Sequence, residues 1–263
     1  LVHVGAGEFG PADRRVHRPL LAALPAGPSR LLLAEPQKDI LNATLRNAKA
    51  FESVLTTVHV VNAAVVGRCD GPARMYAWSK KLQEAFDRPV PLHGYASTNP
   101  QVLHNAIKSA SGDEANAWAK DLRRVKRWKN LTEYVEEIAV DCITVPELLQ
   151  NAGASPGEVV AVVLGAEFAD VDVLRSFFQQ DGFAPTLFML EAGADNKRFV
   201  RLWKEKLLGY TLGRTDLSRR TLGLASHRLA WPRLQLLPWA LSRLAPCGEE
   251  LCPGDTAHER VLH

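Results

Sequence analysis

The stretch VHVGAGEFG, residues 2–10, decides the fold of this chain. Three residues with a strand-like pattern run directly into glycines with the spacing G-x-G-x-x-G. Gly5 and Gly7 permit a left-handed backbone and a close approach of the main chain to a ligand. Gly10 is expected to let the following helix pack closely on the sheet. The stretch therefore predicts a nucleotide-binding turn between a buried parallel strand and a helix.

A second strand, residues 30–34, supports this prediction because it ends in a carboxylate. Its apolar run leads into Glu35 and Pro36. In Rossmann-like folds an acidic residue at this place accepts hydrogen bonds from the ribose of the cofactor. Pro36 cannot donate to a further strand pair, so it ends the strand at the rim of the site. The alternative is a Glu side chain that is merely solvated at a strand end.

The remaining apolar runs indicate an α/β fold. Three of them are typical of strands: residues 57–66, 159–164 and 185–191. The strands alternate with helical segments and short loops, which predicts a Rossmann-like, doubly wound, mostly parallel sheet. We expect this domain to span residues 1–212, with a helical insertion at about 79–138. Residues 213–263 then form a basic, Trp-containing C-terminal extension.

Two local patterns refine this assignment. Residues 73–78 have the composition of a strand that leaves a turn. Thr144 and Glu147 have the spacing of a capping box at the start of a helix.

The insertion carries the most basic run of the chain, residues 122–129, beside Trp118 and Trp128. Arg, Lys and Trp together can grip phosphates and stack on bases. Acidic residues flank the run on both sides, which favours a solvated helix face over nucleic-acid binding. The net charge of +3 argues for neither interpretation.

The order of these pieces resembles the FkbM-type branch of class I S-adenosylmethionine-dependent methyltransferases. The family's motifs align on five stretches in the same order: residues 3–10, 35–36, 62–64, 144–147 and 163–174. The resemblance covers about residues 2–212. It implies the class I methyltransferase fold, an S-adenosylmethionine cofactor and methyl transfer to a hydroxyl of an unidentified substrate. The cofactor-binding residues that it implies are Gly5, Ala6, Gly7, Gly10, Glu35, Pro36, Asn62 and Ala63.

The chain departs from the family pattern on the substrate side. His3 stands where the family has an acidic residue, and the family's Lys and Asp near Glu167 are Val163 and Gly165. Glu167 and Asp170 remain as the two candidate general bases. Either one is alternatively a structural cap of the next helix. We therefore expect cofactor binding to be better preserved than catalysis.

Two further functions fit the same residues. A methyltransferase-like fold that serves as an inactive structural or interaction subunit is favoured by the lost acidic residues. An NAD(P)-dependent oxidoreductase fits the glycine turn with Glu35. Against the oxidoreductase, Pro11 crowds the start of the phosphate-binding helix, and residues 167–174 have no role in it.

A protein partner is expected to bind through the C-terminal extension or the basic insertion. Residues 211–245 alternate apolar and basic segments that suit a partner, an anionic membrane surface or the domain's own sheet. The spacing of Cys247, Cys252, His258 and His263 matches no common zinc site. The sequence contains no stretch of the roughly 20 apolar residues that a membrane span needs.

The four cysteines are too few and too scattered for a disulfide scaffold. This predicts a reducing, intracellular compartment. Because a core strand begins at Val2, we also expect that residues precede Leu1 in the whole protein or that a targeting segment was removed, as in an organelle protein.

Overall fold

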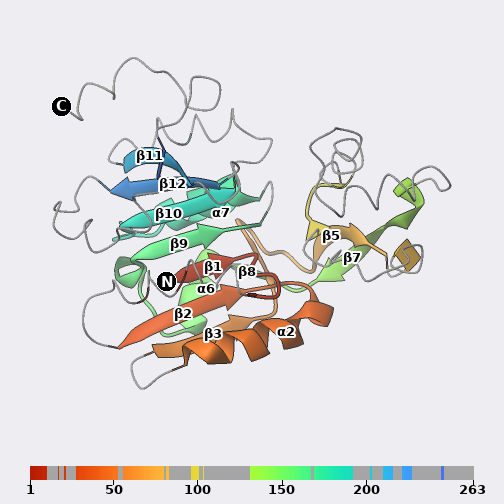
Figure 1. Cartoon of the computed structure of the whole chain (residues 1–263), viewed down its shortest axis with the longest axis horizontal. Coiled ribbons are helices and arrows are strands. Elements are labelled where there is room, and N and C mark those ends of the chain that lie inside the picture. Colours follow the sequence, from red (N-terminus) through yellow and green to blue (C-terminus); the bar gives the residue numbers. More distant parts are fainter. Residues whose placement is uncertain are drawn as a thin grey trace, which may run out of the picture.

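The structure is a computed structural model of residues 1–263. It describes residues 1–10, 17, 21, 28–52, 56–79, 81–82, 96–100, 103, 131–166, 169–191, 202, 210–215, 221–226 and 244–245. These residues form an α/β protein with a mostly parallel main sheet (Figure 1). The sheet order is β13-β11-β12-β10-β9-β1-β2-β3.

Five neighbouring strands of the main sheet are parallel: β10 (Leu187–Glu191), β9 (Ala161–Leu164), β1 (Val2–Val4), β2 (Ser29–Ala34) and β3 (Thr56–Val61). The other three strands are β11 (Tyr210–Thr215), β12 (Thr221–Ser226) and β13 (Leu244–Ala245). β12 is antiparallel to both of its neighbours, β10 and β11. This topology confirms the predicted α/β class with a mostly parallel sheet and is compatible with a Rossmann-like fold.

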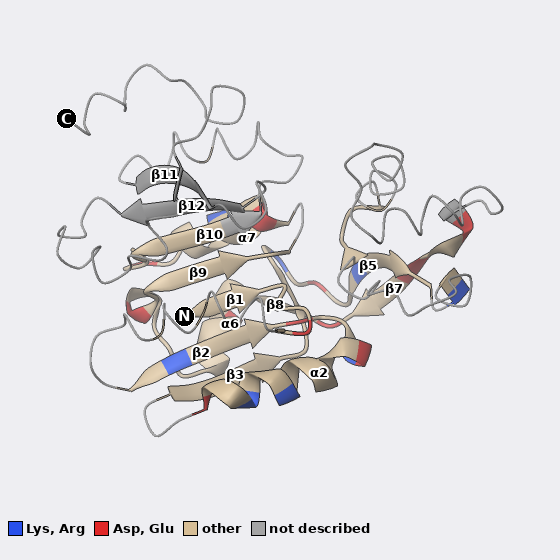
Figure 2. Cartoon of the chain, viewed as in Figure 1, with Lys and Arg blue, Asp and Glu red and all other residues tan. Residues whose placement is uncertain are grey.

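The inner parallel strands are mostly buried on both faces, whereas β3 at the edge of the sheet is half-buried. Val4, Ala34 and Leu164 lie side by side on one face, in a core with α6 (Val145–Asn151) and α7 (Asp170–Phe178). Leu33 lies on the opposite face, which packs against Phe9, the end of α2 (Lys38–Ala48) and the following 3₁₀ turn η1 (Lys49–Phe51). The strands carry few charged residues, as Figure 2 shows. This composition is typical of parallel strands that are covered on both sides.

The predicted strand at residues 57–66 is two strands. β3 ends at Val61, and β4 (Ala64–Val66) leaves the main sheet to pair in parallel with β8 (Cys142–Thr144). The backbone N–H of Ala64 donates to Asp141 O at 2.8 Å, which directs the chain away from β2. The break between the two strands holds Asn62 and Ala63.

A separate three-stranded antiparallel sheet follows β4 and lies apart from the main sheet (Figure 1). Its strands are β5 (Ala73–Trp78), β6 (Ala96–Ser97) and β7 (Val135–Val140). β5 confirms the strand predicted at residues 73–78. Within the predicted insertion at 79–138, the described strands are β6 and the start of β7, and both belong to this small sheet.

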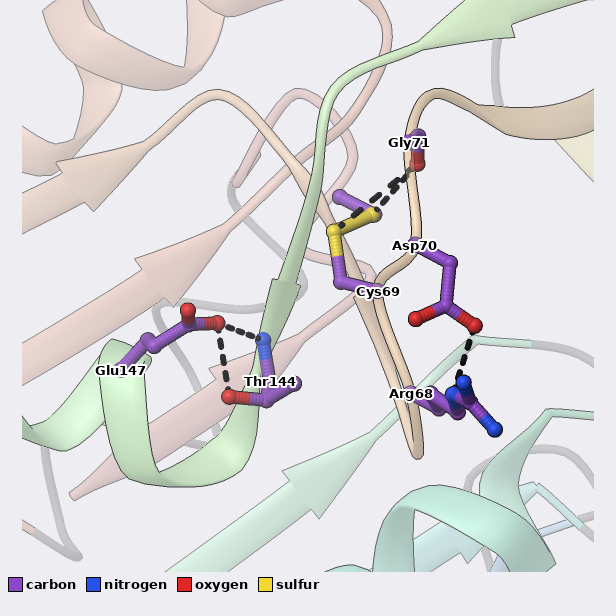
Figure 3. Close-up of a disulfide and its surroundings, with 7 residues drawn as sticks. Arg68, Cys69, Asp70, Gly71, Thr144 and Glu147 are labelled. Atoms are coloured by element: carbon purple, nitrogen blue, oxygen red, sulfur yellow. Dashed lines mark hydrogen bonds and ion pairs between the residues drawn. A yellow bond between two sulfur atoms is a disulfide. The ribbon is translucent and has the colours of Figure 1, made fainter.

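The capping box predicted at the start of α6 is confirmed. One oxygen of Glu147, Oε2, accepts hydrogen bonds from the Thr144 hydroxyl at 2.7 Å and the Thr144 backbone N–H at 2.8 Å (Figure 3). These two hydrogen bonds lower the pKa of the Glu147 carboxyl. A second box joins Ser155 and Glu158 at the 3₁₀ turn η3 (Pro156–Glu158). A further 3₁₀ turn, η2 (Leu131–Tyr134), precedes β7.

A disulfide joins Cys69, which follows β4, to Cys142 at the start of β8 (Figure 3). The count and spacing of the cysteines do not predict this bond, because the two residues are 73 positions apart and meet only through the pairing of β4 with β8. The oxygen of Gly71 lies 2.9 Å from the Cys142 sulfur. A disulfide sulfur carries no hydrogen, so this is a contact rather than a hydrogen bond.

Several predicted features lie outside the described residues: Glu167, the basic run 122–129, most of the C-terminal extension and the Cys247, Cys252, His258 and His263 group. Among the helices that are described, none is long and apolar enough to cross a membrane.

Candidate functional site

The candidate site lies at the carboxyl ends of the parallel strands. β1 has β2 on one side and β9 on the other, because the chain first builds β2 and β3 and later returns to add β9 and β10 (Figure 1). Ligands of open α/β sheets bind at such a reversal of strand order. The glycine turn follows β1, Glu35 follows β2, Asn62 follows β3 and Gly165 follows β9. The predicted residues therefore gather at one end of the sheet.

The glycine turn needs glycine at its first two positions. Gly5 and Gly7 have φ of 73° and 54°, in the left-handed region. A Cβ at Gly5 would also lie 2.5 Å from the oxygen of Gly165. The backbone N–H groups of Gly5 and Ala6 both donate to Ala34 O, at 2.9 and 3.1 Å. The turn is thus held against the ends of both neighbouring strands.

The predicted role of Gly10, close packing of the helix that follows it, falls on residues 11–24, most of which lie outside the described residues. A Cβ built at Gly10 meets no atom within 4 Å, and its φ is not in the left-handed region. The described residues therefore give no steric reason for glycine at this position. A Cβ built at Gly7 likewise meets no atom of the described residues within 4 Å.

Glu35 is buried, with 2% of its surface exposed, and it binds the glycine turn directly. Its Oε2 accepts the backbone N–H of Gly7 at 2.7 Å, and its Oε1 accepts that of Gln37 at 2.9 Å. Burial raises the pKa of this carboxyl, and the hydrogen bonds from Gln37 and Gly7 oppose that shift. Sequence reasoning identified Glu35 as a ligand residue but not as the group that holds the turn.

Asn62 and Ala63 complete this side of the site. The Asn62 side-chain amide donates to Glu35 O at 2.7 Å, and the Glu35 N–H donates to Val61 O at 3.0 Å. Ala63 is buried in the core below. Pro36, between the carboxylate of Glu35 and α2, is half-buried. Hydrogen bonds thus connect Gly7, Glu35 and Asn62 into one rigid unit.

The β9 side of the site is closed by backbone and by Asp170. The N–H of Gly165 donates to Val4 O at 2.9 Å. The carboxylate of Asp170, 6% exposed at the start of α7, accepts the N–H of Ala166 at 2.8 Å. This geometry favours the structural alternative for Asp170, because its oxygen is used to close the turn before the helix.

A buried ring cluster beneath the glycine turn is absent from the sequence predictions. Phe9 has no exposed surface, and its ring centroid lies 4.8 Å from that of His17 and 5.1 Å from that of Phe51. His3 stacks on His17 with the ring centroids 4.8 Å apart. Phe9 is also the one described non-glycine residue with a positive φ, 52°. Phe9 therefore anchors the turn into the core.

We expect the stability of the protein to fall below about pH 6.5, partly because of His3. Burial, and then the charge of His17, hold the pKa of His3 well below its ordinary value of 6.5. A depressed folded-state pKa means that the unfolded chain takes up protons first as the pH falls, which destabilises the fold. The slope contributed by His3 is at most about 1.4 kcal/mol per pH unit. Urea unfolding at about pH 7, 6 and 5 should give a flatter pH dependence for His3→Leu than for the wild type.

His59→Gln is the matched control, because His59 lies on β3 outside the ring cluster. This variant measures the effect of removing a histidine that does not contact the ring cluster. An equal slope in His3→Leu and the wild type would show that His3 does not titrate on unfolding.

The arrangement suits a nucleoside-containing ligand better than a metal ion. Gly5 and Gly7 place main chain without side chains at the point where the strand order reverses, and the carboxylate of Glu35 lies beside them. Within the described part of the chain, no cluster of His, Cys, Asp and Glu can hold a metal ion. Comparisons with protein-family models, curated proteins and solved structures returned no match.

Proposed function

We propose that the protein binds S-adenosylmethionine at the glycine turn and has the class I methyltransferase fold. One observation carries the proposal: the carboxylate of Glu35 contacts the Gly7 N–H at the reversal of strand order. Each carboxylate oxygen has more than one acceptor site, so Glu35 can hold the turn and still accept from a ribose hydroxyl. Among the described residues, no atom lies within 4 Å of a Cβ built at Gly7, which supports a ligand at this place. The residues present therefore fit a nucleoside cofactor.

The proposed activity is methyl transfer to the hydroxyl of a substrate. The cofactor, when bound, supplies a methyl group on a positively charged sulfur. The chain must then hold the acceptor oxygen in line with that group, and the rigid unit of Gly7, Glu35 and Asn62 supports only the cofactor side of this alignment. On the acceptor side, Asp170 accepts the N–H of Ala166 at 2.8 Å, and Glu167 lies outside the described residues.

An inactive binding subunit is the second candidate, and the β9 side favours it. Val163 is half-buried and packs in the apolar cluster with Leu33 and Met189, and Gly165 has no side chain. Neither side chain can form a hydrogen bond that positions the methyl-accepting substrate. The oxidoreductase alternative is weaker, because β12 is antiparallel where the dinucleotide-binding order continues with parallel strands.

Glu35→Ala should weaken the binding of S-adenosylhomocysteine by about 1.5–3 kcal/mol, the usual contribution of a hydrogen bond to a charged group. Isothermal titration calorimetry measures this directly. Glu158→Ala is the matched control, because Glu158 is an exposed carboxylate that pairs with Arg30 at the opposite end of β2. An unfolding curve for each variant separates loss of the ligand contact from loss of the turn. If folded Glu35→Ala binds as tightly as the wild type, the ribose assignment is wrong.

Methyl transfer by the unmodified chain is expected to be weak, and Val163→Lys combined with Gly165→Asp should raise it. The geometry admits the second substitution with a small adjustment, since a Cβ at Gly165 would lie 3.2 Å from Gly5 O. A radiolabelled-methyl assay on small hydroxylated acceptors gives the rates. Rapid turnover by the unmodified chain would show that the acceptor side is already complete.

A further inference from the structure

The disulfide between Cys69 and Cys142 indicates where this chain folds. The two Cα atoms are 5.7 Å apart, within the range that a disulfide requires. This placement is produced by β4 and β8, which pair in parallel with Ala64 opposite Cys142. Disulfides persist in the secretory pathway and other oxidising compartments and are rare in the cytosol.

A second feature of the sequence, an N-glycosylation triplet, can be modified only in the secretory pathway. Residues 42–44 read Asn-Ala-Thr, which is the acceptor triplet for N-linked glycans. The triplet lies within α2, between two residues that face the core, Ile40 and Ala48. A triplet by itself occurs often by chance, so its position in the fold and the disulfide must both support it.

The position of Asn42 suits a glycan. Ile40, Thr44 and Ala48 follow one another at four-residue spacing and form the buried stripe of α2. Asn42 lies two residues from both Ile40 and Thr44, which places it on the opposite, solvent-exposed face. Lys38, Asp39 and Arg46, the charged residues of α2, are exposed as well. A glycan attached at Asn42 would therefore extend into solvent without displacing any packed side chain.

The buried position of Thr44 requires that glycosylation precede folding. Its hydroxyl contacts Gly7 O at 2.5 Å and Ile40 O at 3.1 Å, and the residue has no exposed surface. A glycosylating enzyme must reach this hydroxyl together with Asn42, so it can act only before α2 docks on the sheet. Modification during entry into the compartment, followed by folding and closure of the disulfide, satisfies this requirement.

We propose that Asn42 is an N-glycosylation site and that the chain matures in the oxidising secretory pathway. The proposal is independent of the cofactor, because it rests on α2 and on the β4–β8 pair. It replaces the reducing compartment that the number of cysteines favours. The chain contains one other acceptor triplet, Asn130-Leu131-Thr132, whose Asn130 lies outside the described residues.

Peptide mapping of the protein from its natural source tests the proposal. Tryptic cleavage after Lys38 and Arg46 isolates Asn42 in one short peptide. Treatment with peptide:N-glycosidase in heavy-oxygen water should convert Asn42 in that peptide to a labelled Asp. The unreduced digest should contain Cys69 and Cys142 in one linked species. A peptide with unmodified Asn42, or free thiols at both cysteines, would overturn the proposal.

Variants passed through a eukaryotic secretory pathway provide the controls. Asn42→Gln should remove the mass of one glycan, and Thr44→Ser should retain it because Ser preserves both the acceptor triplet and the buried hydroxyl. Any glycan left on Asn42→Gln should disappear in the double variant with Asn130→Gln. If Asn42→Gln migrates like the wild type after secretion, Asn42 is not an acceptor.

Discussion

Phe9→Ala is expected to lower the free energy of unfolding by about 3–5 kcal/mol, the usual cost of removing a fully buried aromatic ring. The Phe9 ring has no exposed surface and contacts the rings of His17 and Phe51. Its left-handed backbone costs roughly 1–2 kcal/mol, which the packing of the ring offsets. Ala at this position keeps the backbone cost and loses the packing. Chemical denaturation followed by circular dichroism measures the change.

Leu45→Ala is the matched control for this prediction. Leu45 lies on α2 with 40% of its surface exposed, so its truncation should change stability by less than about 0.5 kcal/mol. If Phe9→Ala proves no more costly than Leu45→Ala, Phe9 does not anchor the turn. Because the Phe9 ring anchors the turn, Phe9→Ala should also weaken the proposed nucleoside binding in the fraction of the protein that stays folded.

Removing the disulfide by Cys69→Ser with Cys142→Ser is expected to destabilise the protein by about 4 kcal/mol. The bond closes a loop across a separation of 73 residues, and the chain-entropy relation gives about this value for a loop of that length. The loop contains the whole three-stranded sheet, so β5, β6 and β7 should lose protection before the main sheet does. Unfolding of the wild type with and without a thiol reductant measures the same quantity.

Cys247→Ser with Cys252→Ser is the control for the disulfide. Reductant should still lower the unfolding midpoint of this variant, because Cys69 and Cys142 are unchanged. If reductant has no effect on the wild-type midpoint, either the bond is absent in solution or it contributes nothing to stability.

The sequence allows prediction of the features that depend on neighbouring residues. The glycine turn, the carboxylate after β2 and the capping box at Thr144 are encoded within a few positions, so spacing alone reveals them. The division of residues 57–66 into two strands was missed, because both parts are equally apolar. Only the pairing of β4 with the distant β8 separates them.

Contacts between distant residues account for the other omissions. Cys69 and Cys142 meet through strand pairing, and His3 stacks on His17 through packing beneath the turn. Asp170 appeared as a candidate base because its residue type fits that role, whereas its hydrogen bond to Ala166 depends on how the chain enters α7. No local pattern in the sequence contains that information.

The hydrogen bonds between α2 and the glycine turn couple the site to a whole helix. Thr44 contacts Gly7 O, and the side-chain amide of Asn47 donates to Glu8 O at 2.7 Å. Any molecule that fixes the turn therefore also favours the docked state of α2, in proportion to its free energy of binding. Slower amide hydrogen exchange along Lys38–Ala48 would then report that a ligand is bound at the glycine turn. Compounds of unknown chemistry can be sorted by their effect on that helix, with no assay for a reaction.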